Sequence, residues 1–266
     1  MALHGAGYFA IGFGGGVKDL SPFQGQHWIQ AARFMGNAPV EIAKPNFMMY
    51  LPVGDSLIPI GVAYTERVSA GSALPTDLDG APAEWHTHIF CRNATGEGNV
   101  LADGVEDCKQ RGGTPAPMQI AMVHAWTVPN PDGPFAHDNP ALPFIATGLK
   151  PPAHATQDER LFGVALGESY GAMLVEAHQI DIAARRYGRR EQLERHRAVI
   201  RSLVPELRDE QRAGQIAKFE STKKTVMDEW TALAAEYRAL AQTPEIRARF
   251  DMDLGMAIGT MAHHHM

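Results

Sequence analysis

The sequence predicts an α+β protein, in which an antiparallel β unit at about residues 40–130 is followed by a helical C-terminal region. Residues 1–156 hold 16 of the 18 prolines and 19 of the 26 glycines, a composition typical of strands joined by turns and loops. Residues 157–266 hold 16 of the 24 lysines and arginines and only two prolines, which favours helices. We therefore expect a β-rich domain at 1–156 and a helical region at 157–266, packed on the first domain or mediating oligomerisation.

Size and charge exclude several classes of protein. With 266 residues, of which 45% are apolar, the chain can bury a sizeable core. A formal net charge of −6 disfavours nucleic acid as a partner, because phosphate binding needs clustered lysine and arginine. The sequence has no run of about eighteen apolar residues, so we expect no membrane span.

The first twenty residues have no basic segment and no clear small-residue cleavage motif, so we predict no signal peptide. Two interpretations stay open, a cytoplasmic protein and an exported protein whose leader has been removed.

The first elements expected are a short helix and a hairpin. Pro22–Met35 has apolar residues at helical spacing, which predicts a helix that carries His27. Asn46–Pro52 and Leu57–Arg67 are rich in aromatic and β-branched residues, so we expect two strands there. The glycine and aspartate between them, in Val53–Ser56, predict a tight turn that joins the strands as a hairpin.

Two further strands and two loops follow. Glu84–Cys91 and Met118–Val128 are apolar-rich and are predicted to be strands. The intervening residues 93–117 are rich in glycine, asparagine, aspartate and proline, which favours a long loop. Residues 129–156 contain too many prolines for regular structure, so we expect an ordered loop over the surface.

The helical region is expected to contain four segments, Gln157–Arg186, Arg190–Leu203, Pro205–Gln242 and a last helix that begins after Thr243. Gly188 is suited to end the first of them, because glycine adopts the left-handed conformation common after helices. Pro205 is suited to the first turn of a helix, where its missing N–H costs no hydrogen bond. Thr243 is suited to be an N-cap.

The most informative motif is Trp85-His86-Thr87-His88. Side chains at positions i and i+2 of a strand point to the same face, so both imidazoles are expected side by side. His124, in the next predicted strand, can add a third nitrogen. Imidazole suits copper, zinc and iron alike, so the sequence predicts one mononuclear transition-metal site without identifying the ion. The alternative interpretation is a set of histidines on a polar strand face with no ligand.

A fourth ligand would come from outside these two strands. His27 is the candidate that we favour, and His137 in the proline-rich loop is the other. The aromatic residues Trp85, Phe90 and Trp126 are expected to form an apolar surround. Glu84 shares a face with His86, which makes its carboxylate a candidate proton acceptor or hydrogen-bond partner of a ligand.

Two functions fit such a site. Three ligands with an open position favour a metal-dependent oxidoreductase or hydrolase, whose substrate the sequence does not identify. Four closed ligands favour a non-catalytic metal-binding or interaction module, in which the C-terminal helices dock a partner or a second subunit. The terminal His263, His264 and His265 could bind metal nonspecifically.

Two cysteines, Cys91 and Cys108, lie in the same stretch as the histidines. A disulfide between them would close a loop of about eighteen residues and stabilise the fold by roughly 3 kcal/mol. In a reducing compartment, two free thiols or metal ligands are the alternative.

Several short motifs across residues 5–137 resemble an uncharacterised bacterial family, many of whose members are exported. The motifs are Gly7-Tyr8, His27, Pro45 to Tyr50, Gly61 to Tyr64, Trp85 to Cys91, Cys108 to Gly113 and Met122 to His124. The resemblance implies a shared fold in which His27, His86, His88 and His124 lie near one another and Cys91 lies near Cys108. It also implies export, whereas the missing leader and the helical tail depart from the family pattern.

A shorter resemblance links Gly80, His86 and His88 to the opening of the first cupin motif. A cupin has a glutamate three or four residues after the second histidine, where this chain has Arg92 and Asn93 instead. The glycine and proline of the second cupin motif have no counterpart before the third histidine, so the cupin analogy is weak.

Overall fold

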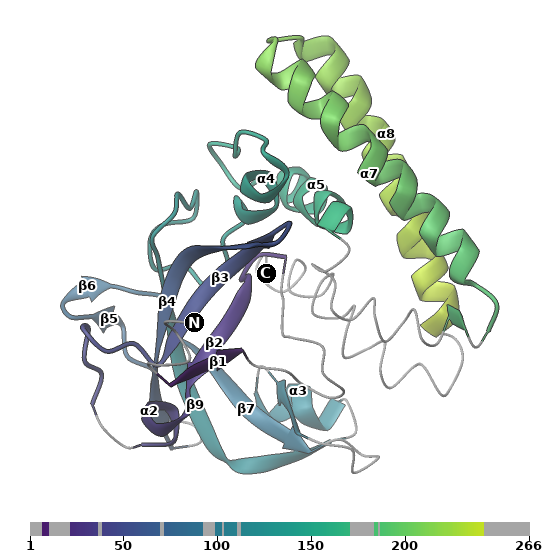
Figure 1. Cartoon of the computed structure of the whole chain (residues 1–266). Helices are drawn as coiled ribbons and strands as arrows, with labels where there is room; N and C mark the ends of the chain where they lie inside the picture. Colours follow the sequence, from purple (N-terminus) through teal and green to yellow (C-terminus); the bar gives the residue numbers. More distant parts are fainter. Residues whose placement is uncertain are drawn as a thin grey trace. The chain divides into compact units, whose positions relative to one another are not determined.

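The computed structural model describes residues 7–10, 22–36, 39–69, 72–92, 99–102, 104–110, 113–170, 184–185 and 187–241. The chain divides into two compact units, which we call the sheet unit (residues 1–19 and 24–139) and the helical unit (residues 20–23 and 140–266). The predicted α+β class is confirmed, because the first unit is built on an antiparallel sheet and the second on helices (Figure 1). Among the described helices, none is long and apolar enough to cross a membrane.

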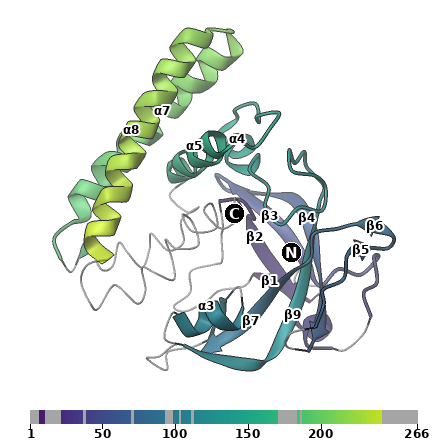
Figure 2. The same cartoon turned by 180° about the vertical axis from the view of Figure 1, so that it is seen from behind.

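The sheet unit contains one seven-stranded sheet, with the order β1-β2-β3-β4-β9-β7-β8 among its described strands. Figure 2 labels β1 to β4, β7 and β9 of this sheet. In chain order these strands are β1 (Tyr8–Ala10), β2 (Gln26–Gln30), β3 (Phe47–Val53), β4 (Ser56–Val68), β7 (His86–Arg92), β8 (Asn99–Ala102) and β9 (Thr114–Trp126). The remaining elements of the unit are the strand pair β5 (Asp77–Leu78) and β6 (Ala81–Pro82) and the short helices α2 (Ala31–Met35) and α3 (Val105–Gln110).

The predicted hairpin and the two later strands are confirmed. The strands β3 and β4 pair as an antiparallel hairpin, and Gly54 between them has a φ of 56°, in the left-handed region that glycine tolerates. The strands β7 and β9 correspond to those predicted at 84–91 and 118–128, with ends that differ by a few residues. They are direct neighbours in the sheet, which brings the histidines that they carry close together.

Three predictions about local structure before residue 156 are wrong. Only Ala31–Met35 of the helix predicted at 22–35 is helical, because the backbone of β2 pairs with β3 instead, so His27 lies on a strand. The loop predicted at 93–117 contains β8 and α3. The loop predicted at 129–156 contains a short helix, α4 (Leu142–Thr147), which tolerates its proline in the first turn.

The strand register gives the sheet two distinct faces. Cross-strand partners share a face, and side chains alternate along each strand. One face, which we call the histidine face, carries His27, Phe47, Met49, Ala63, Thr65, His86, His88, Ile120, Met122 and His124. An apolar cluster that includes Tyr64, Ala121 and Val123 packs on the opposite face.

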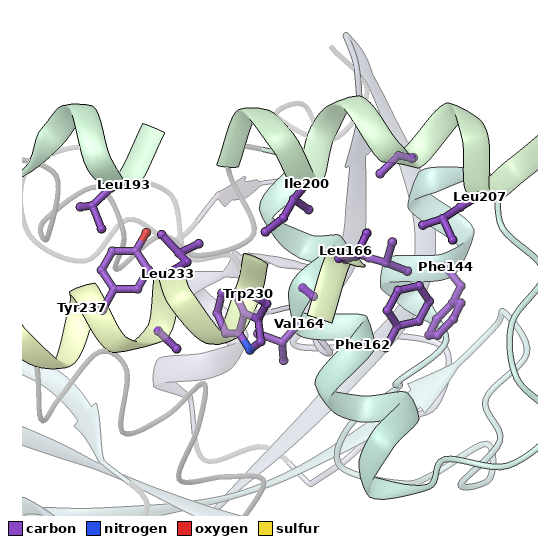
Figure 3. Packing of buried hydrophobic residues seen from close by; sticks show 14 of the residues in the cluster. Phe144, Phe162, Val164, Leu166, Leu193, Ile200, Leu207, Trp230, Leu233 and Tyr237 are labelled. Atoms are coloured by element: carbon purple, nitrogen blue, oxygen red, sulfur yellow. The ribbon is translucent and has the colours of Figure 1, made fainter. Parts of the chain in front are cut away.

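The helical unit consists of α4, α5 (Gln157–Gly167), the 3-10 turn η1 (Glu168–Tyr170), α7 (Arg190–Arg212) and α8 (Ile216–Ala241). Apolar side chains from α4, α5, α7 and α8 pack together to form its core (Figure 3). The labelled core residues are Phe144, Phe162, Val164, Leu166, Leu193, Ile200, Leu207, Trp230, Leu233 and Tyr237.

The helix boundaries differ from those predicted. Pro205 lies inside α7 rather than at a helix start, and the next helix begins only at Ile216. An interior proline costs about 3 kcal/mol, which the burial of Val204 and Leu207 on either side helps to offset. The α5 helix ends at Gly167, before the predicted end at residue 186, and is followed by η1. The last predicted helix, which begins after residue 243, lies outside the described residues.

Candidate metal centre

Five histidines of the sheet unit form one cluster, which we call the histidine cluster. It consists of His27 on β2, His86 and His88 on β7, His124 on β9 and His137 in the loop after β9. The ring centroids of His86 and His137 are 3.9 Å apart, and those of His86 and His88 are 4.7 Å apart. The ring centroids of His27 and His124 are 5.3 Å apart. Imidazoles from three strands and one loop therefore converge on one place.

The convergence requires a curled sheet. The strands β2 and β9 are separated by β3 and β4, so in a flat sheet their backbones would lie about 14 Å apart. Parallel side chains at that spacing could not touch. The Nε2 atoms of His27 and His124 are nevertheless only 3.4 Å apart. The histidine face is therefore concave, and the cluster lies within its curve.

Three members of the cluster form a group that could hold a metal ion. One ring nitrogen from each of His86, His88 and His137 lies within 4.8 Å of the other two. Two nitrogens bound to one tetrahedral ion are about 3.4 Å apart, so each ring would need to move inward by roughly 1 Å or less. Both ring nitrogens of His86 are buried without a hydrogen-bond partner in the part of the chain that the structure describes. An ion would satisfy one of them.

His124 and His27 extend this group. The Nδ1 atom of His124 donates to the backbone carbonyl of His137 at 2.5 Å, because a carbonyl can only accept. In a neutral ring this leaves the lone pair on Nε2, which faces the Nε2 atom of His27 at 3.4 Å. A carbonyl that fixes the tautomer in this way is common behind metal-binding histidines.

The loop that carries His137 is held by hydrogen bonds to its backbone. The backbone N–H of His137 donates to Glu84 Oε2 at 3.0 Å. The indole N–H of Trp126 donates to the carbonyl of Ala136 at 2.7 Å. These contacts place His137 on the histidine face although no strand carries it.

Gln24 supports the same loop through its side chain. Its amide nitrogen lies 3.0 Å from His137 Nε2 and donates to Asp138 Oδ1 at 2.9 Å. One amide group therefore contacts both the candidate ligand and the carboxylate that follows it.

Burial keeps the clustered imidazoles neutral. Burial first, and the charge of His137 second, lower the pKa of His27 to about 4 and that of His88 to about 3. Burial also holds the pKa values of His86 and His124 well below the ordinary value. At neutral pH each of these four rings therefore offers a lone pair, the form that binds a metal ion.

The structure groups the ligand atoms differently from the sequence prediction. His86 and His88 are together as predicted, but His137, the less favoured candidate, joins them in the most compact group. Metal binding by His124 and His27, which lie directly beside this group, stays a prediction.

A signal for His137 exists in the sequence. It is directly followed by Asp138, and this pair of polar residues is buried in the structure. Adjacent ionisable residues in a proline-rich loop are a reason to expect an anchored, functional loop rather than a solvated one.

The expected apolar surround is only partly present. Trp126 lies beside His124, with ring centroids 5.5 Å apart. Trp85 instead packs in the apolar cluster on the opposite face, because successive side chains of an extended chain point to opposite sides. The side chain of Phe90 lies outside the described residues.

Glu84 supports the site in a way that the sequence did not specify. Its carboxylate accepts from the backbone of His137 rather than from an imidazole N–H. It therefore positions a candidate ligand through the main chain.

Cys91 and Cys108 form a disulfide, which removes both from the candidate metal ligands. The pair is buried against Ile89 and Val105. Cys91 lies on β7, the strand that carries the His-x-His pair, and Cys108 lies on α3, so the bridge ties the helix to the strand.

A surface hollow of about 640 Å³ borders the histidine face. Its lining includes Thr65, Arg67 and Ile120, and Ile120 is the cross-strand partner of His88. Glu66 and Val68, which face the other side of the sheet, also line the hollow, and no histidine of the cluster does, so the hollow is a separate feature of β4 and β9.

We compared the chain with known proteins by family, by sequence and by structure. No family model matches it, and no curated protein or solved structure matches it either. What the site can do follows from its own geometry, which is that of clustered imidazoles able to hold a metal ion.

Proposed function

We propose that this protein binds one transition-metal ion through His86, His88 and His137, and that a fourth coordination position is open to a small molecule. The observation that carries the proposal is the convergence of three ring nitrogens within 4.8 Å, two of them from a His-x-His pair on one strand. His124 and His27 lie beside this group and are the candidates to join or replace a ligand.

The burial of ring nitrogens without a hydrogen-bond partner favours a bound ion over an empty cluster. A buried polar atom without a partner costs about 1–3 kcal/mol, and both nitrogens of His86 are in that state among the described residues. A fold that served only to pack these residues would be more stable with apolar side chains in their place. A bound metal would offset the cost, because each coordinated nitrogen gains a partner.

An open position is supported by the number of ligands and by their exposure. A mononuclear site with three protein ligands keeps its fourth position for water or substrate. His86 and His88 both retain some surface exposure, although the ring nitrogens of His86 are shielded. This arrangement fits a metal-dependent enzyme better than a closed storage site.

The direct test is elemental analysis of full-length protein purified without metal-affinity resin and with His263, His264 and His265 replaced by alanine. We expect close to one equivalent of copper, zinc or iron per chain. The His86→Ala/His88→Ala double variant should contain none, because it loses two of the three ligands.

A matched control is His154→Ala, which removes an exposed histidine of the helical unit. This variant should keep the full metal content. Metal-free parent protein that takes up no added copper, zinc or iron would contradict the proposal, as would a double variant that binds as well as the parent.

A further inference from the structure

We propose that the ion is monovalent copper, Cu(I), held by a donor set without charge. This inference rests on the proposed function, since it names the ion that the same site takes. It follows from three features of the site: a histidine face without carboxylates, two buried methionines on that face and a single buried carboxylate behind His137.

The histidine face offers only neutral donors. Among the described residues that the strand register assigns to it, none is aspartate or glutamate. The two cysteines are joined in a disulfide and supply no thiolate. The desolvation penalty of an ion rises with the square of its charge, so it is about four times larger for a divalent than for a monovalent ion. A buried donor set of neutral imidazoles therefore favours the monovalent ion.

Two methionines place soft sulfur atoms on this face. Met122 is the direct cross-strand partner of His86 and stands two residues before His124, so its side chain is a neighbour of both on the same face. Met49 is the direct cross-strand partner of His27. Met122 is 5% exposed and Met49 is fully buried. Thioethers are ligands that select Cu(I), whereas imidazole suits zinc and copper alike.

One buried carboxylate is close enough to balance a single positive charge. Asp138 Oδ1 lies 3.9 Å from His137 Nδ1, and the Asp138 side chain is 10% exposed. Glu84 also approaches the backbone of His137, but Glu84 is exposed to solvent, which screens its charge. The buried surroundings thus supply about one negative charge, which matches Cu(I) and leaves a divalent ion half uncompensated.

The test is an anaerobic competition titration of the full-length protein without its terminal histidines. Cu(I) would be titrated against bicinchoninate and Zn(II) against a chromophoric chelator. We expect one equivalent of Cu(I), bound with a dissociation constant at least about 100-fold below that of Zn(II).

Methionine variants test the contribution of the thioethers. Met122→Leu keeps the size of the side chain and removes the sulfur. It should weaken Cu(I) binding by about tenfold and leave Zn(II) binding unchanged. The matched control is Met48→Leu on the same sheet, because Met48 packs against Trp28 and Tyr50 in a separate apolar cluster. This variant should change neither affinity.

The outcomes separate the two proposals. Zn(II) bound as tightly as Cu(I) would overturn the assignment of Cu(I) while the metal site itself stands. No binding of either ion would overturn both. Equal effects of Met122→Leu and Met48→Leu on Cu(I) would contradict the role of the thioether.

Discussion

Two buried polar sites, one in each unit of this protein, are satisfied in different ways. In the helical unit Arg197, which is 5% exposed, donates to Glu168 Oε2 at 2.9 Å and also donates to the hydroxyl of Tyr237. A third bond runs from its Nη1 atom to Glu194 at 3.2 Å. In the sheet unit burial lowers the pKa of His27, His86, His88 and His124, and both nitrogens of His86 lack a hydrogen-bond partner among the described residues.

The difference separates structural from functional polar groups. The burial of the Arg197 charge is accounted for by its hydrogen bonds within the helical unit. His86 has two buried nitrogens without a partner and lies in a group of converging imidazoles, which favours a ligand from outside the polypeptide such as a metal ion. Changes in the helical unit should therefore affect stability alone, whereas changes in the histidine cluster should affect binding.

The largest expected effect is the loss of the arginine in the helical unit. Arg197→Ala leaves Glu168 as a buried charge without its main partner. Breaking a buried pair in this way typically lowers the free energy of unfolding by about 3–5 kcal/mol. Urea unfolding followed by far-ultraviolet circular dichroism would measure the loss. The metal content should not change.

Arg201→Ala is the matched control for this change. Arg201 lies on the same helix and also pairs with Glu194, but its side chain is 39% exposed. Exposed pairs contribute about 0–1 kcal/mol, so the control should be nearly neutral. A large loss in Arg201→Ala, or a loss of metal in Arg197→Ala, would weaken the contrast between the two units.

The second prediction concerns the disulfide of the sheet unit. The half-cystines are 17 residues apart, so Cys91→Ala/Cys108→Ala should lower the stability of this unit by about 3 kcal/mol. In a Trp230→Phe background every remaining tryptophan lies in the sheet unit, so fluorescence reports on that unit alone. The parent protein with its disulfide reduced should show the same loss of stability by fluorescence. A loss seen only in the circular dichroism transition would contradict this prediction.

The third prediction concerns pH. The folded-state pKa of His27, about 4, lies below its ordinary value of 6.5, so the unfolded chain takes up a proton first. The contribution of His27 to the stability of the metal-free sheet unit is therefore complete above pH 6.5 and is lost as the pH falls through about 4. Each such histidine contributes a slope of about 1.4 kcal/mol per pH unit.

Fluorescence-monitored urea unfolding in the presence of a chelator, repeated between pH 7 and about 4, would measure this slope. The variant His27→Phe removes one titrating ring, so its slope should be smaller by one proton. An unchanged slope in this variant would show that His27 does not resist protonation in the folded protein.

The smallest effect is expected from a change at Asp138, which lies beside His137, and it concerns the affinity for the metal ion. Asp138→Asn removes the buried negative charge 3.9 Å from His137 and should weaken metal binding by about tenfold, as is common for groups that support a ligand. Asp55→Asn, in the exposed turn of the β3–β4 hairpin, is the control and should bind normally. Equal affinities for the two variants, measured by competition titration, would exclude a role for Asp138.

Part of the fold and of the site could be predicted from the sequence. The change in composition near residue 156 indicated the α+β class, and the alternation of side chains along a strand brought His86 and His88 to one face. The pairing of β2 with β3 is a tertiary effect, which overrode the helical spacing around His27. His137 lies in a loop whose position depends on hydrogen bonds from distant residues, and no periodic pattern encodes such contacts.

The two methionines are a second example of a feature that depends on tertiary structure and could not be predicted from the sequence. Met49 and Met122 are ordinary apolar residues in the sequence, where each fits a strand core. Only the register, which pairs Met49 with His27 and Met122 with His86, reveals that they share the histidine face. Register depends on how turns and side chains fit together across strands, so it could not be predicted from one strand at a time.

The measurement that tests the central claim most directly is unfolding of the Trp230→Phe protein with and without metal. Cu(I) and Zn(II) would be added in turn to protein without its terminal histidines, and both transitions would be recorded. An ion at about 100 times its dissociation constant should stabilise the sheet unit, seen by fluorescence, by about 2.7 kcal/mol. The helical transition, seen by circular dichroism, should not move, and His86→Ala/His88→Ala should abolish the shift. Stabilisation that survives in this double variant, or no stabilisation by either ion, would contradict a metal site in the histidine cluster.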